Sequence, residues 1–318
     1  MLLSICIPTY NRAEYLKKSL ESLVDQECWP HPEVEIVISN NASTDDTAAV
    51  IAEYVSRYPE NIRANNLSSG IDAHDNFDLV LELGRGDFVK HNNDTLMWEP
   101  GMLGEFVDML KQIPADIFLT PSSLMAPAAE RRVLLLDGLD DTVKYCSYFL
   151  TWIGNLCVRK DLFLALEDRN RKIASRLTQV DVILRLIFSG ARAVIDGRIF
   201  FRTQNIVKNL DYHTAEVFGS NYFDLLGEYL GNGISREVFE KEKKRVLLDF
   251  IIPGHFDFFH EKAGIRQCGF WKHTKIYHKD FYFYCSFFKI SFLWLVSRFF
   301  THEQLRRLKY RIMRKKSS

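Results

Sequence analysis

The sequence has no excess of charge of either sign. In a chain of 318 residues, 41 lysines and arginines balance 41 aspartates and glutamates. A balanced chain produces no overall field that would attract a polyanion, so we predict no nucleic-acid partner. The exception is local, because residues 301–318 hold seven basic residues and only Glu303 as an acid.

The sequence also lacks the cysteine patterns of secreted and zinc-binding proteins. Its six cysteines form no CxxC pair and no framework of regular spacings. Cys6 lies within an apolar run, which predicts a small core residue. Met1 leads directly into the first expected strand, which leaves no room for a signal peptide. We therefore expect a protein of the reducing cytoplasm.

No apolar run is long enough to predict a spanning helix. Residues 281–300 are rich in aromatic and aliphatic side chains, but Lys289 and Arg298 interrupt them, and a spanning helix needs roughly 20 apolar residues. Aromatic residues followed by a basic tail are typical of a helix that lies in the membrane interface. We expect peripheral attachment to the inner face of the cell membrane. A buried helix and a self-association surface are the alternatives.

What the chain does contain is an alternation of strands and helices. Strands are expected near residues 2–7, 34–38, 61–67, 87–90 and 115–119, with an amphipathic pattern after most of them. A further amphipathic helix is expected at 177–188, and a strand pair or broken strand at 191–202. This order predicts an α/β fold, a mostly parallel sheet with helices on both faces. Helical patterns dominate after about residue 205, so we divide the chain into residues 1–120, 121–205 and 206–318.

Three of the expected strands end in small, polar or acidic residues. The segments are SICIPTYNR (Ser4–Arg12), SNNASTDDT (Ser39–Thr47) and GDFVKHNND (Gly86–Asp94). Carboxyl ends of parallel strands open onto the crevice where such sheets bind ligands. The pattern predicts a site for a phosphorylated, hydroxyl-rich ligand.

In order and spacing these segments resemble the family 2 glycosyltransferases, inverting enzymes with the GT-A fold that include many of bacterial surface-polysaccharide synthesis. The resemblance covers roughly residues 2–120 and extends more loosely to Arg202. It implies a nucleotide-sugar donor, a divalent cation (Mg²⁺ or Mn²⁺) and an acceptor hydroxyl. The competing nicotinamide-binding fold would need GxGxxG after the first strand, where this chain has PTYNRA.

The resemblance places the donor-binding residues at these strand ends. The Tyr10 ring would lie against the nucleobase. Asn11 is expected to cap a helix, with Glu14 three residues on as its capping-box partner. The amino end of that helix would favour phosphate. Asn40 stands where the family usually has aspartate, so an uncharged amide replaces a carboxylate. The alternative is that Asn40 and Asn41 are turn residues with no contact to the nucleotide. The expected donor-binding residues are Pro8, Thr9, Tyr10, Asn11, Arg12, Asn40, Asn41, Ser43, Asn92 and Asn93.

The cation is expected at Asp94. This residue takes the place of the last acid in the family's DxD motif, which here reads Asn92-Asn93-Asp94. Magnesium often binds through one or two carboxylates together with phosphates and water, so a single acid can suffice. The alternative is that Asp94 caps the turn that follows.

Inversion also requires a base for the acceptor hydroxyl. Asp181 has the context in which the family places it, a polar turn, an acid and then an apolar helix, and its carboxylate would gain from the helix amino end if it lies in the first turn. A solvated helix acid is the alternative. The other candidates, with weaker context, are Asp137, Asp140, Asp141 and Asp161.

The acceptor itself is expected near Trp152, Gly154 and Asn155. An indole can stack on a sugar face, and a glycine lets a ring approach closely; a core tryptophan is the alternative. We expect a lipid-linked glycan as acceptor, in the assembly of lipopolysaccharide or capsule. Two non-enzymatic functions compete with this one, a sugar-nucleotide-binding module and a scaffold protein.

Overall fold

The computed structural model describes residues 1–120, 133–204, 216–251 and 304. The chain divides into two compact units, Met1–Ile206 and Val207–Ser318. The aromatic segment 281–300 and the basic tail, on which the membrane prediction depends, lie outside the described residues.

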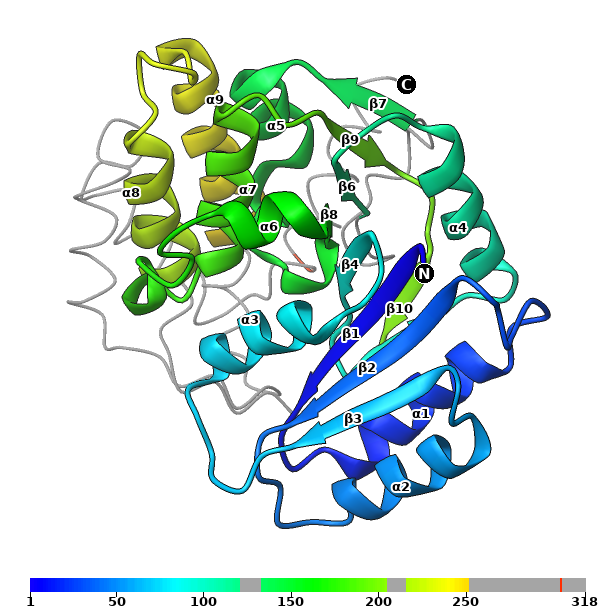
Figure 1. Cartoon of the computed structure of the whole chain (residues 1–318). Helices are drawn as coiled ribbons and strands as arrows, with labels where there is room; N and C mark the ends of the chain where they lie inside the picture. Colours follow the sequence, from blue (N-terminus) through cyan, green and yellow to red (C-terminus); the bar gives the residue numbers. More distant parts are fainter. Residues whose placement is uncertain (121–132, 205–215, 252–303, 305–318) are drawn as a thin grey trace. The chain divides into compact units, whose positions relative to one another are not determined.

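The first unit is built on one sheet (Figure 1). Among the described residues eight strands form it, in the order β3-β2-β1-β4-β8-β6-β9-β7. Six strands run in one direction, while β7 and β8 run against their neighbours. The predicted mostly parallel sheet is confirmed. The strands are β1 (Leu3–Thr9), β2 (Val34–Asn40), β3 (Ile62–Asn66), β4 (Phe88–His91), β6 (Ile117–Leu119), β7 (Val133–Leu136), β8 (Leu156–Arg159) and β9 (Ala193–Asp196).

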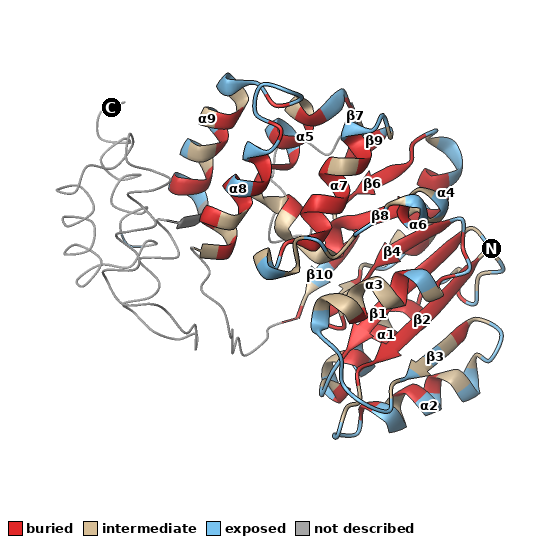
Figure 2. Cartoon of the chain, turned by 60° about the vertical axis from the view of Figure 1, so that its left-hand side comes forward, coloured by how far each residue is buried: buried red, intermediate tan, exposed pale blue. Residues whose placement is uncertain are grey.

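Helices cover both faces of this sheet. Figure 1 shows α1 and α2 on one side of strands β1 to β3 and α3 on the other. Every residue of β1 and β2 is buried, and Figure 2 shows these strands as the inner layer. Near-continuous burial is what a strand covered on both faces requires. The helices of this unit are α1 (Ala13–Val24), α2 (Thr47–Arg57), α3 (Ala73–Leu83), α4 (Met102–Gln112), α5 (Gly138–Cys146), α6 (Lys160–Ala165) and α7 (Thr178–Phe188), with short 3₁₀ turns η1 (Ser147–Thr151), η2 (Ile153–Asn155) and η3 (Ile173–Ser175).

A small second sheet joins two distant parts of the unit. Strand β5 (Leu96–Trp98) pairs antiparallel with β10 (Phe201–Thr203). The predicted break in the 191–202 strand is confirmed, because β9 ends at Asp196 and β10 begins at Phe201. Strand β5 was not predicted. It is only three residues long, and its partner comes from the far end of the unit.

The second unit is helical where the structure describes it. It contains α8 (Tyr222–Gly227) and α9 (Arg236–Val246), with single π-helical turns η4 (Glu216–Asn221) and η5 (Leu247–Ile251) beside them. Phe223 packs edge-on against Phe239, with ring centroids 5.9 Å apart. The predicted helical carboxyl-terminal region is confirmed. Among the described helices, none has the length and apolar character needed to cross a membrane.

Candidate functional site

The carboxyl edge of the first three strands carries a row of polar side chains. Thr9, at the end of β1, is in register with Asn40 at the end of β2, and Asn40 is in register with Asn66 at the end of β3. Nδ2 of Asn40 donates a 3.0 Å hydrogen bond to Oδ1 of Asn66. The row lies where open α/β sheets bind their ligands.

Asp94 adds a carboxylate to this row from the turn after β4. Its Oδ2 accepts a 3.0 Å hydrogen bond from Oγ1 of Thr9, and Nη1 of Arg12 lies 3.8 Å from its Oδ1. Asp94 is 7% exposed, and this burial raises the pKa of its carboxyl to about 6, although the Arg12 guanidinium opposes the rise. A buried carboxylate with one cation at this distance would be stabilised by a second positive charge.

The surroundings of Asp94 fit a divalent cation that also needs oxygens from a ligand. Within the described residues no three His, Cys, Asp or Glu side chains come together as a complete metal site. Asn93 is half-buried next to Asp94. Magnesium commonly takes one or two carboxylates and completes its shell with phosphate and water. Asp94 therefore fits a cation held jointly with a bound diphosphate.

The Asn92 side chain is hydrogen-bonded inside the protein and is not open to a ligand. It is fully buried, and its Oδ1 accepts a 2.9 Å hydrogen bond from the indole Nε1 of Trp98. Its Nδ2 donates to the hydroxyl of Ser19 at 3.4 Å. A buried indole N–H needs an acceptor, so this amide ties the turn after β4 to β5 and α1. The donor contact that we expected of Asn92 stays a prediction.

The predicted N-cap at Asn11 is wrong. Helix α1 begins at Ala13, with Arg12 at the cap position and no side-chain cap. Asn11 has φ 51°, and its Oδ1 accepts a 2.7 Å hydrogen bond from the backbone N–H of Thr44. The Asn11 side chain therefore links the loop after β1 to the loop after β2. The sequence near the start of α1 does not indicate this contact, because Thr44 lies 33 residues away.

Two amide groups at the start of α1 are paired with side chains that follow β2. The N–H of Arg12 donates to Oγ1 of Thr47 at 3.2 Å, and the N–H of Ala13 donates to a carboxylate oxygen of Asp45 at 3.1 Å. A helix amino end binds phosphate through its unpaired N–H groups. These two are paired, whereas the Arg12 side chain beside them carries a positive charge and is 41% exposed.

The remaining residues predicted at this edge fall into two groups. Tyr10 and Pro8 form the first group. Tyr10 is 55% exposed and next to Thr9, as a ring that stacks on a base would be. Pro8 lies within β1. Asn41 and Ser43 make contacts within the protein. Asn41 exchanges two 2.9 Å hydrogen bonds with the backbone of Ile71, and the Ser43 hydroxyl accepts from the N–H of Asn11 at 2.9 Å.

Trp152, Gly154 and Asn155 form one compact turn ahead of β8. A Cβ at position 154 would lie 2.7 Å from Cζ2 of Trp152 and 2.9 Å from Cδ1 of Leu96, so glycine is needed there by the indole itself. Trp152 is half-buried and packs against the core. Asn155 is buried, and its Oδ1 has no hydrogen-bond partner among the residues that the structure describes. The acceptor contacts expected of these three residues stay predictions.

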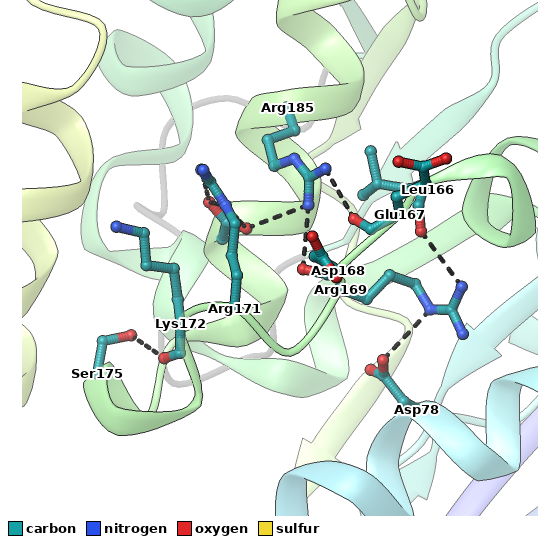
Figure 3. A network of polar contacts seen from close by, with 10 residues as sticks. Asp78, Leu166, Glu167, Asp168, Arg169, Arg171, Lys172, Ser175 and Arg185 are labelled. Carbon is teal, nitrogen blue, oxygen red and sulfur yellow. Dashed lines mark hydrogen bonds and ion pairs between the residues drawn. The ribbon is translucent and has the colours of Figure 1, made fainter.

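Asp181 is buried on α7 and bound by arginine. The helix begins at Thr178, so Asp181 lies in its first turn. Nε of Arg171 lies 2.9 Å from Oδ2 of Asp181, and Nη2 lies 2.5 Å from Oδ1, while Arg185 is 3.6 Å away. Figure 3 shows Arg171 on the segment before α7, next to Arg185. A base for an acceptor would have to be reached past the Arg171 guanidinium, which is 37% exposed.

The other acids considered as bases lie elsewhere in the unit. Asp137 precedes α5, with Asp140 and Asp141 in its first turn. Asp161 is exposed at the start of α6 and pairs with Arg159 at 2.7 Å.

Helix α3 connects the start of α7 to the end of β4. Nδ1 of His74 lies 3.1 Å from the hydroxyl of Thr178, and the Phe77 ring packs edge-on against His91, with centroids 5.9 Å apart. On its other side, the first turn of α7 reaches the acceptor turn, because Nε2 of Gln179 donates to the carbonyl of Thr151 at 2.7 Å. The predicted donor, acceptor and base residues therefore belong to one connected set of elements.

Two residues of this region were not identified from the sequence. Asn66 could have been, because its strand also runs parallel and ends in the polar pair Asn65-Asn66. Lys90 gave no usable signal. It lies on β4 and is fully buried, and a lysine in a short strand ordinarily indicates exposure.

The amino-terminal part of the chain matches a known family. Residues 4–122 match the family model described as glycosyl transferase family 2. This part of the chain is similar to a family 2 glycosyl transferase domain. Over 90 residues it is 43% identical to the abequosyltransferase RfbV of Salmonella typhimurium, a segment that is 28% of this chain and 26% of RfbV. The match thus spans about a quarter of that relative's length.

Solved structures have a fold similar to that of most of this chain. The structure of Staphylococcus aureus TarS 1–349 has a TM-score of 0.58 at 15% identity, covering 81% of this chain and 80% of that one, and TarS 1–349 has also been solved with UDP-GlcNAc. The mannosyltransferase PcManGT from Pyrobaculum calidifontis, solved with GDP-Man and Mn²⁺, has a TM-score of 0.51 at 14% identity and covers 78% of this chain and 70% of that one. At these identities the likeness is one of fold, the GT-A fold.

Proposed function

We propose that this chain transfers a sugar from a nucleotide-sugar donor to an acceptor hydroxyl, with inversion at the anomeric carbon. The observation that carries the proposal is the group of Asp94, Thr9 and Arg12 at the carboxyl edge of a family 2 domain. It combines a buried carboxylate with an exposed guanidinium, which suits a cation and a diphosphate together. The nucleotide sugars bound by TarS and PcManGT support the same class of donor.

In this proposal each residue has a defined part in the donor site. Tyr10 lies against the nucleobase, and Asn40 with Asn66 presents amides to the edge of the base or ribose. Arg12 pairs with diphosphate oxygens. A divalent cation at Asp94 would neutralise charge on the departing diphosphate.

The transfer step needs a proton acceptor on the other side of the sugar. The acceptor oxygen forms a bond to the anomeric carbon, the bond from that carbon to the phosphate oxygen breaks, and the hydroxyl proton passes to a base. We assign the base to Asp181. Because Arg171 holds this carboxylate with three hydrogen bonds, Arg171 has to turn aside when the acceptor binds.

We also propose that the acceptor is a lipid-linked glycan on the inner face of the cell membrane, used in surface-polysaccharide assembly. The name of RfbV, an abequosyltransferase, supports sugar transfer. The basic residues at 301–318 and the aromatic segment before them support attachment to an anionic surface.

The first test is a thermal-shift screen of the full chain. UDP-, GDP-, CMP- and dTDP-sugars are each added with Mn²⁺ or with EDTA. A ligand at 100 times its dissociation constant stabilises the fold by about 2.7 kcal/mol. A metal-dependent shift with one nucleotide supports the donor site, and release of the free nucleotide separates an enzyme from a binding module. The absence of any shift would favour a scaffold protein.

A further inference from the structure

Lys90 is an unusual residue in the centre of the first unit. It lies on β4, is 0% exposed, and is in register with Ile5 of β1 on one side and Cys157 of β8 on the other. Its Nζ donates two hydrogen bonds of 2.9 Å, one to the carbonyl of His91 and one to the carbonyl of Gly154.

The surroundings of this ammonium group are aromatic. Nζ lies 4.2 Å from the ring centroid of Phe201 and 5.9 Å from those of Trp98 and Phe106. In the described part of the chain no carboxylate pairs with it. Cation–π contacts and two carbonyls compensate part of the lost hydration. Methionine would fill the same space with no charge to desolvate, so packing alone does not account for a lysine here.

The two carbonyls that Lys90 joins belong to different parts of the site. His91 immediately precedes the Asn92–Asp94 turn, on the donor side. Gly154 lies in η2, the turn with Trp152 and Asn155 on the expected acceptor side. We infer that Lys90 is a positioning residue that fixes the spacing between these two turns. The names donor side and acceptor side rest on the proposed function. The link between the two turns rests on the two hydrogen bonds of Nζ.

The link should matter more for transfer than for donor binding. Asp94 keeps its own contacts to Thr9 and Arg12 when Lys90 is changed, so donor affinity should persist. The acceptor turn loses its connection to the donor turn, and a misplacement of about 1 Å at a reacting centre can cost 10²-fold in rate. Lys90→Met is therefore expected to leave the donor KM within about threefold and to lower kcat about 10- to 100-fold.

Val89→Ala provides the matched control. Val89 is the neighbouring residue of β4 and is also fully buried, but its side chain points to the opposite face of the sheet. This change removes core packing and leaves the Nζ hydrogen bonds in place. It should lower the midpoint of thermal unfolding and leave the ratio of kcat to KM near that of the wild type, after correction for folded protein.

The experiment has one arm that needs no substrate. Amide hydrogen exchange is measured on the full chain for the wild type, Lys90→Met and Val89→Ala. In Lys90→Met the amides of Asn92 and Asn155 should exchange at least about tenfold faster relative to the amides of β2, whereas Val89→Ala should affect the sheet evenly. An even change, or none, in Lys90→Met would overturn the link.

The second arm measures turnover with UDP-glucose, UDP-N-acetylglucosamine and GDP-mannose as donors, p-nitrophenyl glycosides as acceptors, and Mn²⁺. Equal losses in KM and kcat, or none, would contradict a positioning role. A wild-type chain that uses none of these probes counts against the proposed function, while the exchange arm still decides the link. If Lys90→Met does not fold, Lys90→Gln replaces it. Its side chain is one bond shorter, which draws the nitrogen away from the two carbonyls, so unchanged protection at both turns would refute the link.

Discussion

Thr9 and Asp94 share a 3.0 Å hydrogen bond between the ends of two neighbouring strands, although 85 residues separate them in the sequence. The bond places a carboxylate that burial makes costly to ionise at the edge where the polar row begins. Arg12 is the one cationic group in ion-pair range of Asp94 among the described residues. A cation that enters with a ligand would therefore stabilise the ionised form of Asp94 strongly.

Asp94→Asn should lower metal-dependent turnover by at least about 10²-fold, because an amide oxygen cannot neutralise the cation. The measurement is release of nucleoside diphosphate with Mn²⁺ and with EDTA. Asp87→Asn, on the exposed residue at the other end of β4, is the control and should keep its activity. Normal turnover in Asp94→Asn would remove Asp94 from the metal site.

The same variant should be more stable than the wild type at neutral pH. The folded-state pKa of Asp94 is raised to about 6, so the fold favours the protonated form and loses stability as pH rises from about 4 through 6. The amide introduced by the substitution does not titrate, and the difference should reach about 1–3 kcal/mol above pH 7. Urea unfolding at pH 4 and pH 8, without metal, measures it; an equal difference at both pH values would contradict the burial argument.

Thr9→Val should weaken the metal-dependent donor shift without abolishing it. The valine has the shape of threonine but leaves Oδ2 of Asp94 without its donor, a loss of about 1 kcal/mol or roughly fivefold in affinity. Thr9→Ser keeps the hydroxyl and serves as the control. Titration of Mn²⁺ in the presence of the nucleotide provides the affinity. If valine and serine behave alike, the hydrogen bond has no part in binding.

Two roles of Asp181 can be tested separately, the proposed one as base and one as anchor of the segment before α7. As the base, Asp181→Asn should lower kcat about 10²- to 10⁴-fold in a folded protein. Arg171→Met tests the anchor, because it leaves a buried carboxylate with Arg185, at 3.6 Å, as its one cation among the described residues, and should destabilise the fold by about 1–3 kcal/mol. A pure anchor would instead give both variants similar losses of stability, with turnover falling only in proportion to folded protein.

Lys90 should make stability depend on pH in the alkaline range. Burial lowers its pKa to about 7, so between about pH 7 and 10 the unfolded chain binds a proton that the folded chain does not. Wild-type stability should therefore rise relative to Lys90→Met by about 1.4 kcal/mol for each pH unit in this range. Denaturant unfolding of both proteins at pH 7, 8 and 9 measures the difference. Parallel profiles would mean that Lys90 keeps an ordinary pKa.

The basic tail should hold the chain on anionic membranes. We expect the full chain to sediment with vesicles that contain phosphatidylglycerol, and a chain ending at Lys279 to remain in the supernatant. Neutral vesicles of phosphatidylcholine are the control for electrostatic attraction. Equal sedimentation of the full and shortened chains would place membrane binding elsewhere or nowhere.

The fold was predictable because its strands are local patterns. The apolar run of β1, entirely buried in the sheet, and the apolar face of α7 both appear in the sequence as they do in the structure. Strand β5 was not predictable, because three residues are too few to show an alternation of apolar and polar side chains. Its pairing with β10 also depends on a segment about a hundred residues away. Short elements of this kind are specified by tertiary contacts.

The site was predictable only as a set of strand ends. The sequence indicates that Asp94 and Thr9 lie at one edge, because parallel strands end together. It does not indicate which polar side chains are used inside the protein. Asn11 bonds to the loop of Thr44 and Asn92 to Trp98, and each of these partners comes from a different loop or strand.

The order of the strands along the chain has a consequence for synthesis. Strands β1 to β4 are complete once residue 91 has been made, but β8, which covers the free edge of β4, is complete only at residue 159. Until Gly154 and Phe201 follow, Lys90 lacks the carbonyl and the ring that they contribute, and we expect its ammonium group to be hydrated. A charged side chain on an exposed strand discourages pairing with a second chain. We therefore expect the lysine that lies buried in the finished protein to oppose aggregation of the growing chain.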